Sequence, residues 1–101
     1  MLLLLPMDSD KVQEASLVTI GDSTIWALLK VEDGQLIEVT HYDTFEEIQE
    51  WIDFAIVSND TEYVWPFMEK QIMVLVAYMQ RSIDDIVEAF IFKELMDFPN
   101  A

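Results

Sequence analysis

Two stretches of the chain are apolar at every position, which is the pattern of a strand buried on both faces. The first is Leu2–Leu5, ended by Pro6, and the second is Ile72–Ala77. A half-buried strand would instead alternate apolar and polar residues. A strand covered on both faces belongs inside a sheet that carries helices on each side. The pattern therefore predicts two inner or well-covered strands.

Two further segments, 24–32 and 35–41, are rich in β-branched and aromatic residues. Between them lies Asp33-Gly34, the dipeptide that favours the two positive φ angles of a type I′ turn. We expect a β-hairpin here. A fourth apolar run, Phe54–Val57, predicts another short buried strand.

Three helices are predicted from capping residues and apolar spacing. Thr44 and Glu47 match a capping box, and Phe45, Ile48 and Ile52 share one helical face, so a short helix is expected over 44–52. Pro66 suits the first position of a helix, which predicts a helix over 66–70. A second capping box, Ser82-Ile-Asp-Asp85, opens the final helix.

The order is strand, strand, strand, helix, strand, helix, strand, helix. This order predicts one α/β domain over residues 1–98, with three layers: a five-stranded mixed sheet and helices on both of its faces. Residues 99–101 are expected to form a loose C-terminus.

Composition excludes several classes of function. Five basic and twenty acidic residues give a formal charge of −15, which repels nucleic acid and anionic membranes. The chain has no cysteine, which fits a reducing cytoplasm and rules out disulfides and thiolate chemistry. No secretory signal follows the start, and no window approaches the roughly 20 apolar residues of a membrane span. We therefore expect a cytoplasmic protein.

The final helix carries an apolar pair outside its core stripe. Ile83, Ile86 and Phe90 belong to that stripe, whereas Phe92 and Met96 fall among the acidic residues on the far side. Exposed apolar side chains rimmed by charge mark a surface for a protein partner or for self-association. The alternative is that the helix packs on both sides, with Phe98 against this pair.

Four aspartates follow predicted strands: Asp8, Asp10, Asp22 and Asp60. Loops after parallel strands gather at one end of a sheet, and carboxylates gathered there could bind magnesium for hydrolysis. The alternative is that they are solvated turn residues. The only histidine, His41, lacks the further ligands that a metal site needs and is expected at the surface, near a strand end. No nucleophile elbow or glycine-rich phosphate loop is present, so we do not expect an enzyme.

Four segments, in order, resemble the dinitrogenase iron-molybdenum cofactor biosynthesis family, a group of small ribonuclease H-like α/β domains. They are "LLLLPMDSD", "IGDSTIWALLKVEDGQLIEV", "IDFAIVSNDTEYVWPFMEKQIMVLVA" and "SIDDIVEAFIFKEL". The resemblance implies an iron-molybdenum or iron-sulfur cluster as ligand, held at loops that here contain Asp8, Asp10, Gly21, Asp22, Asn59 and Asp60.

The chain departs from the family pattern in these loops. Asp22 stands where the family has an arginine, and Ser58-Asn59-Asp60-Thr61 replaces a glycine-rich turn. Carboxylates there repel an anionic cluster. We therefore expect a non-catalytic binding or interaction domain with altered ligand loops. The alternatives are a cluster carrier or insertion protein and a divalent-metal-dependent hydrolase.

Overall fold

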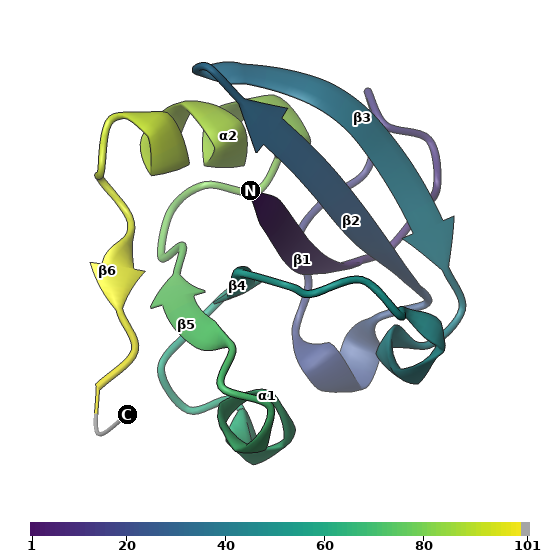
Figure 1. The fold of residues 1–101 in the computed structure, drawn as a ribbon, viewed down its shortest axis with the longest axis vertical. Helices are drawn as coiled ribbons and strands as arrows, with labels where there is room; N and C mark the ends of the chain where they lie inside the picture. The colour runs from purple at the N-terminus through teal and green to yellow at the C-terminus, as the bar shows by residue number, and fades with distance from the viewer. Residues whose placement is uncertain (100–101) are drawn as a thin grey trace.

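Six strands form one mixed sheet in this computed structural model, which describes residues 1–99 (Figure 1). They are β1 (Leu2–Met7), β2 (Ile25–Glu32), β3 (Gln35–Tyr42), β4 (Phe54–Val57), β5 (Met73–Val76) and β6 (Met96–Asp97). Their order across the sheet is β3-β2-β1-β4-β5-β6. The expected five strands are thus all present, and β6 is a sixth that the sequence did not predict.

The sheet has a parallel centre and antiparallel edges. β4 pairs in parallel with both β1 and β5, whereas β2 is antiparallel to β1 and β3, and β6 is antiparallel to β5. The hairpin between β2 and β3 is confirmed, because Asp33 and Gly34 both have positive φ, 53° and 73°, as a type I′ turn requires.

Two apolar cores lie on opposite faces of the sheet, which makes a single mixed α/β domain of three layers. On one face, Ile83, Ile86 and Val87 of α2 (Ile83–Ile91) pack against Leu3 and Leu5. On the other, Phe67 of α1 (Trp65–Glu69) packs in a cluster with Leu4. The leucine run therefore alternates between two cores, and Leu3, Leu4 and Leu5 are all fully buried. None of the helices in residues 1–99 has the length and apolar character needed to cross a membrane.

β1 continues through Pro6 to Met7 and does not end at the proline. The Pro6 carbonyl accepts a hydrogen bond from the Val18 N–H at 3.1 Å, on the side away from β2. A residue's N and C=O point to the same side of a strand, so the missing N–H of Pro6 faces the loop and not the β2 ladder. β4 pairs with β1 only at Leu3 and Leu4, so this position also lies beyond the β4 ladder.

The helix expected over 44–52 is not formed. Only a single 3-10 turn, η2 (Phe45–Glu47), follows Thr44, whose N–H donates to Glu47 Oε1 at 3.0 Å. The chain then runs without regular secondary structure to Asp53, whose side chain accepts the Leu2 N–H at 2.8 Å and whose N–H donates to the Leu2 carbonyl at 3.0 Å. The segment carries the chain from β3, at one edge of the sheet, to β4 beyond β1, and the two hydrogen bonds between Asp53 and Leu2 fix its end.

The other two helices are confirmed, with shorter bounds for the last. Pro66 lies in the first turn of α1, and Ser82 caps α2 by accepting the Asp85 N–H at 3.1 Å. α2 ends at Ile91, because Lys93 adopts a left-handed conformation with φ 58°. The chain then turns back and forms β6. Of the predicted loose C-terminus, residues 100 and 101 lie outside the described residues.

Candidate functional site

Three loops meet at the carboxyl ends of the parallel strands β1, β4 and β5. They are residues 8–24, 58–64 and 77–82. Each pair of loops is joined by a hydrogen bond: the Leu17 N–H donates to the Arg81 carbonyl at 2.7 Å, the Ile20 N–H to Glu62 Oε1 at 3.1 Å, and the Tyr78 hydroxyl to Asp60 Oδ2 at 3.0 Å. Each loop is therefore held by hydrogen bonds to the other two.

Glu62 is the central residue of this arrangement, and the sequence did not point to it. Its carboxylate accepts the Ile20 N–H and, through Oε2, the Ser58 hydroxyl at 3.1 Å. Ser58 is buried. The only signal in the sequence is the spacing from Ser58 to Glu62, which alone does not distinguish this residue from the other acids.

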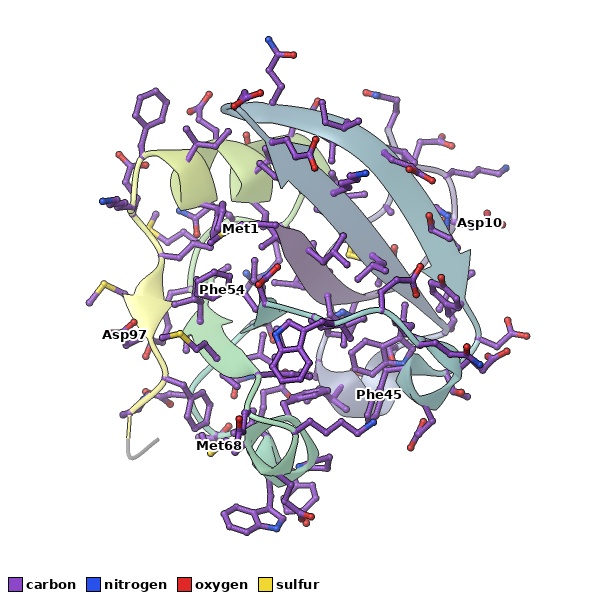
Figure 2. All side chains as sticks on the ribbon, in the orientation of Figure 1. Met1, Asp10, Phe45, Phe54, Met68 and Asp97 are labelled. Carbon is purple, nitrogen blue, oxygen red and sulfur yellow. The ribbon has the colours of Figure 1, made fainter. Side chains whose placement is uncertain are left out.

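Two of the four predicted aspartates, Asp8 and Asp60, accept hydrogen bonds from within the loops. Asp8 Oδ1 accepts the Ser16 N–H at 2.8 Å and closes its own loop, while Asp10 lies exposed beyond it (Figure 2). The hydrogen bond to Asp60 raises the pKa of Tyr78 above its usual value. Within residues 1–99, no three His, Cys, Asp or Glu side chains lie close enough to hold a metal ion. The four aspartates thus do not meet as one set.

Gly21, Asp22 and Asn59 take part in local turns. Gly21 and Asp22 lie in the 3-10 turn η1 (Ile20–Asp22), where the Asp22 N–H donates to Thr19 Oγ1 at 3.3 Å. A Cβ at Gly21 would meet nothing within 4 Å, so packing does not require glycine there. Asn59 Oδ1 accepts the Thr61 N–H at 2.9 Å, as in an Asx turn.

Arg81 is the cation of the 77–82 loop, and it binds backbone oxygens. Its Nη1 donates to the carbonyls of Ala77 and Gln80, both at 2.8 Å, and its Nη2 to the Tyr78 carbonyl at 3.2 Å. The guanidinium therefore stabilises the loop conformation through three hydrogen bonds to backbone carbonyls of the same loop.

His41 is partly buried, contrary to the expected surface position. It pairs with Ala27 of β2, and its Nε2 is buried without a hydrogen-bond partner among residues 1–99. Opposite residues of an antiparallel pair share a face, so His41 lies on the α2 side of the sheet with Ala27.

A second candidate surface runs along the β6 edge of the sheet. Phe92 and Met96 are 68% and 58% exposed, but they do not share a helix face as expected: Phe92 caps α2 and Met96 belongs to β6. Trp65 of α1 and Met73 of β5 are also exposed. Between α1 and β6 lies a groove of about 650 Å³, with Met68 and Phe98 in its walls. We name Trp65, Met73, Phe92 and Met96 the β6 surface.

Comparison with known proteins identifies the fold. No protein-family model matches the sequence, and no curated protein sequence matches it either. Among solved structures, a crystal structure of a "putative dinitrogenase", MJ0327 from Methanocaldococcus jannaschii, is 16% identical with a TM-score of 0.78, covering 100% of this chain and 97% of that one. The NMR structure of MJ0327 is 18% identical with a TM-score of 0.75, covering 100% and 95%.

The protein PH0822 is 16% identical with a TM-score of 0.74, covering 99% of this chain and 98% of that one. These matches extend over whole chains at low identity, so they establish a common fold. The chain therefore shares the fold of the putative dinitrogenase MJ0327 and of PH0822, and the resemblance of its sequence to the dinitrogenase iron-molybdenum cofactor biosynthesis family is confirmed at the level of the fold.

Proposed function

We propose that this chain is a non-catalytic binding domain of ribonuclease H-like topology that acts in the cytoplasm by docking a basic protein partner on the β6 surface. The observation that carries the proposal is the exposure of four large apolar side chains, each between 57% and 68% exposed: Trp65 and Met73 line the groove between α1 and β6, Met96 belongs to β6, and Phe92 caps α2. Large exposed apolar side chains beside an apolar groove favour a protein interface. Aromatic residues and methionine are also enriched in interfaces.

The charge of the molecule selects the kind of partner. A formal charge of −15 repels a second copy of the same chain, anionic membranes and nucleic acid, and it attracts a basic protein over a distance of about 10 Å at 0.1 M salt. A basic partner is therefore favoured over self-association.

The described loops do not fit an anionic metal cluster. The chain has no cysteine to bind iron, and carboxylates of Asp8, Asp60 and Glu62 lie in the three loops. Arg81, one of the two cations in these loops with Lys11, already donates to three carbonyls. We therefore do not extend the family's cluster-carrying role to this chain.

The test compares Met96→Glu with Met79→Glu, a control in which an 87% exposed methionine lies in the 77–82 loop, away from the β6 edge. The partner is captured from cell extract on the immobilised protein, purified, and titrated calorimetrically against each variant. Met96→Glu is expected to weaken binding by about tenfold or more, because it places a charge in an apolar contact, whereas Met79→Glu leaves binding unchanged. Binding that is equal for both variants contradicts the proposal.

Sedimentation of the purified protein supplies the second measurement. We expect a monomer at every concentration because of the mutual repulsion. A dimer that Met96→Glu dissociates would assign the β6 surface to a second copy of the chain and not to a basic partner.

A further inference from the structure

A second cavity lies at the opposite end of the parallel strands from the three loops. It has a volume of about 520 Å³ and lies between the start of β4, the β2–β3 turn and the segment that follows α2. In Figure 2, Met1, Phe54 and Asp97, which all line this cavity, lie on the same side of the molecule, near β1, β5 and β6. Its volume is within the range of about 300–1,000 Å³ that is typical of small-molecule sites.

The walls of this cavity are largely apolar and belong to elements that are held in place by core packing. Phe54 and Phe90 contact each other edge to face, with ring centroids 5.2 Å apart, and join β4 to α2. The remaining apolar walls are Val31, Leu75, Ile91 and Leu95. Because Val31 and Leu75 are buried core residues, two sides of the cavity belong to the rigid sheet.

The segment after α2 borders the cavity without filling it. Lys93 is left-handed, which turns the chain back towards β5, where β6 pairs at Leu75 and Val76. Ile91 and Leu95 line the cavity, whereas Phe92, the bulkiest residue of the segment, is 68% exposed. Phe92, the largest side chain of this segment, therefore lies outside the cavity.

The charges select an uncharged occupant. The charged side chains at the rim are of both signs, Asp33 and Asp97 against Lys93, so the mouth has no concentration of one charge. The field of a molecule with a charge of −15 disfavours anions such as fatty acids. We propose that this cavity binds an uncharged apolar small molecule.

This site is separate from the β6 surface, although the two share a segment. Leu95 and Asp97 line the cavity, whereas Phe92 and Met96 lie at the exposed edge. Substitutions at Leu95 and at Met96 therefore test the two proposals independently.

The test uses two fluorescent probes that differ by one sulfonate group. N-phenyl-1-naphthylamine is uncharged, and 8-anilinonaphthalene-1-sulfonate is its anionic analogue. We expect the uncharged probe to bind saturably, one per chain, with a dissociation constant on the order of 10 μM, which suits a molecule of this size in an apolar pocket. The sulfonate should bind at least about tenfold more weakly because of the negative field.

Leu95→Trp, which places a larger aromatic side chain in the wall of the cavity, should weaken binding of the uncharged probe by about tenfold or more, whereas Phe92→Trp, which enlarges an aromatic side chain outside it, should leave binding unchanged. Circular dichroism confirms the fold of both variants, and Ile91→Phe serves as a second filling variant if Leu95→Trp does not fold. The proposal is overturned if the uncharged probe does not saturate, if both probes bind equally, or if a folded variant with the larger side chain binds the uncharged probe as tightly as the unchanged protein.

Discussion

Both helices end on a residue in a left-handed conformation that is not glycine. In α1, the Gln71 N–H donates to the Met68 carbonyl and the Ile72 N–H to the Phe67 carbonyl, both at 2.9 Å, with Gln71 at φ 62°. In α2, Lys93 and Glu94 make the equivalent bonds to Phe90 and Ala89. This pair of bonds is the Schellman motif, whose left-handed position favours glycine because a Cβ there is strained by roughly 1–2 kcal/mol.

Gln71→Gly and Lys93→Gly should therefore stabilise the protein. We expect each to raise the free energy of unfolding by about 0.5–1 kcal/mol, because the relieved strain exceeds the added entropy of glycine in the unfolded chain. Urea denaturation measures the change. Lys70→Gly is the matched control: Lys70 has φ −92°, so glycine brings no relief there and should lower the stability.

Lys93 also shows why the end of α2 could not be predicted. Glycine is the usual residue at a left-handed helix end, and Lys93 does not give that signal in the sequence. Phe92 and Met96 are four residues apart, which is helical spacing, so the sequence predicted that both lie on the final helix. The chain instead turns at Lys93, between them. The left-handed turn is compatible with β6 pairing to β5, a contact that local sequence does not encode.

At the scale of elements, the loop containing Glu62 holds the loop after β1. The Glu62 carboxylate accepts both the Ile20 N–H and the Ser58 hydroxyl, and hydrogen bonds to a charged acceptor contribute more than neutral ones.

Glu62→Gln should lower the free energy of unfolding by about 1–2 kcal/mol, because a neutral amide offers one acceptor oxygen for two donors. Equilibrium urea denaturation is again the measurement. Glu69→Gln is the control, since Glu69 is exposed at the end of α1, and it should change the stability by less than about 0.5 kcal/mol. Equal effects at the two positions would contradict the role assigned to Glu62.

The strands were predictable because burial on both faces leaves an unbroken apolar run, as at Leu2–Leu5, and because Asp33-Gly34 determines its own turn. The segment 44–52 was not predictable. Phe45, Ile48 and Ile52 have helical spacing and do contribute to the core beneath α1, but they do so from a 3-10 turn and an extended chain. The anchoring of Asp53 to Leu2 joins residues far apart in sequence, which no local pattern reveals.

At the scale of the whole molecule, the excess of negative charge affects the pKa of one partly buried side chain, the phenol of Tyr42. Burial raises the pKa of Tyr42 above its usual value of 10.0, and the carboxylates of Glu50, Glu38 and Glu47 raise it further. The folded state therefore holds this proton more tightly than the unfolded state does. Its contribution to stability is complete below about pH 10 and is lost as the pH rises through the higher folded pKa.

The stability of the protein should consequently fall as the pH rises above about 10, and Tyr42→Phe should make this fall shallower, because phenylalanine has no proton to lose. Thermal denaturation across this range measures both slopes. A slope that is the same in the variant would mean that Tyr42 does not contribute.

The order of elements predicted that loops would gather at one end of the sheet, and the structure confirms this. The partners within those loops were not predictable. Twenty acidic residues are nearly equivalent in the sequence, and only the folded arrangement distinguishes Glu62, which joins two loops, from Asp10, which lies exposed.

The pairwise bonds among the three loops have a consequence for how this end of the molecule opens. Each loop holds the other two, so a loop that detaches removes one support from both of its neighbours. Fluctuations there are therefore cooperative: amide protons in all three loops should exchange with solvent in a common opening event. A protease or ligand that approaches this end encounters either the closed set of loops or all three released together.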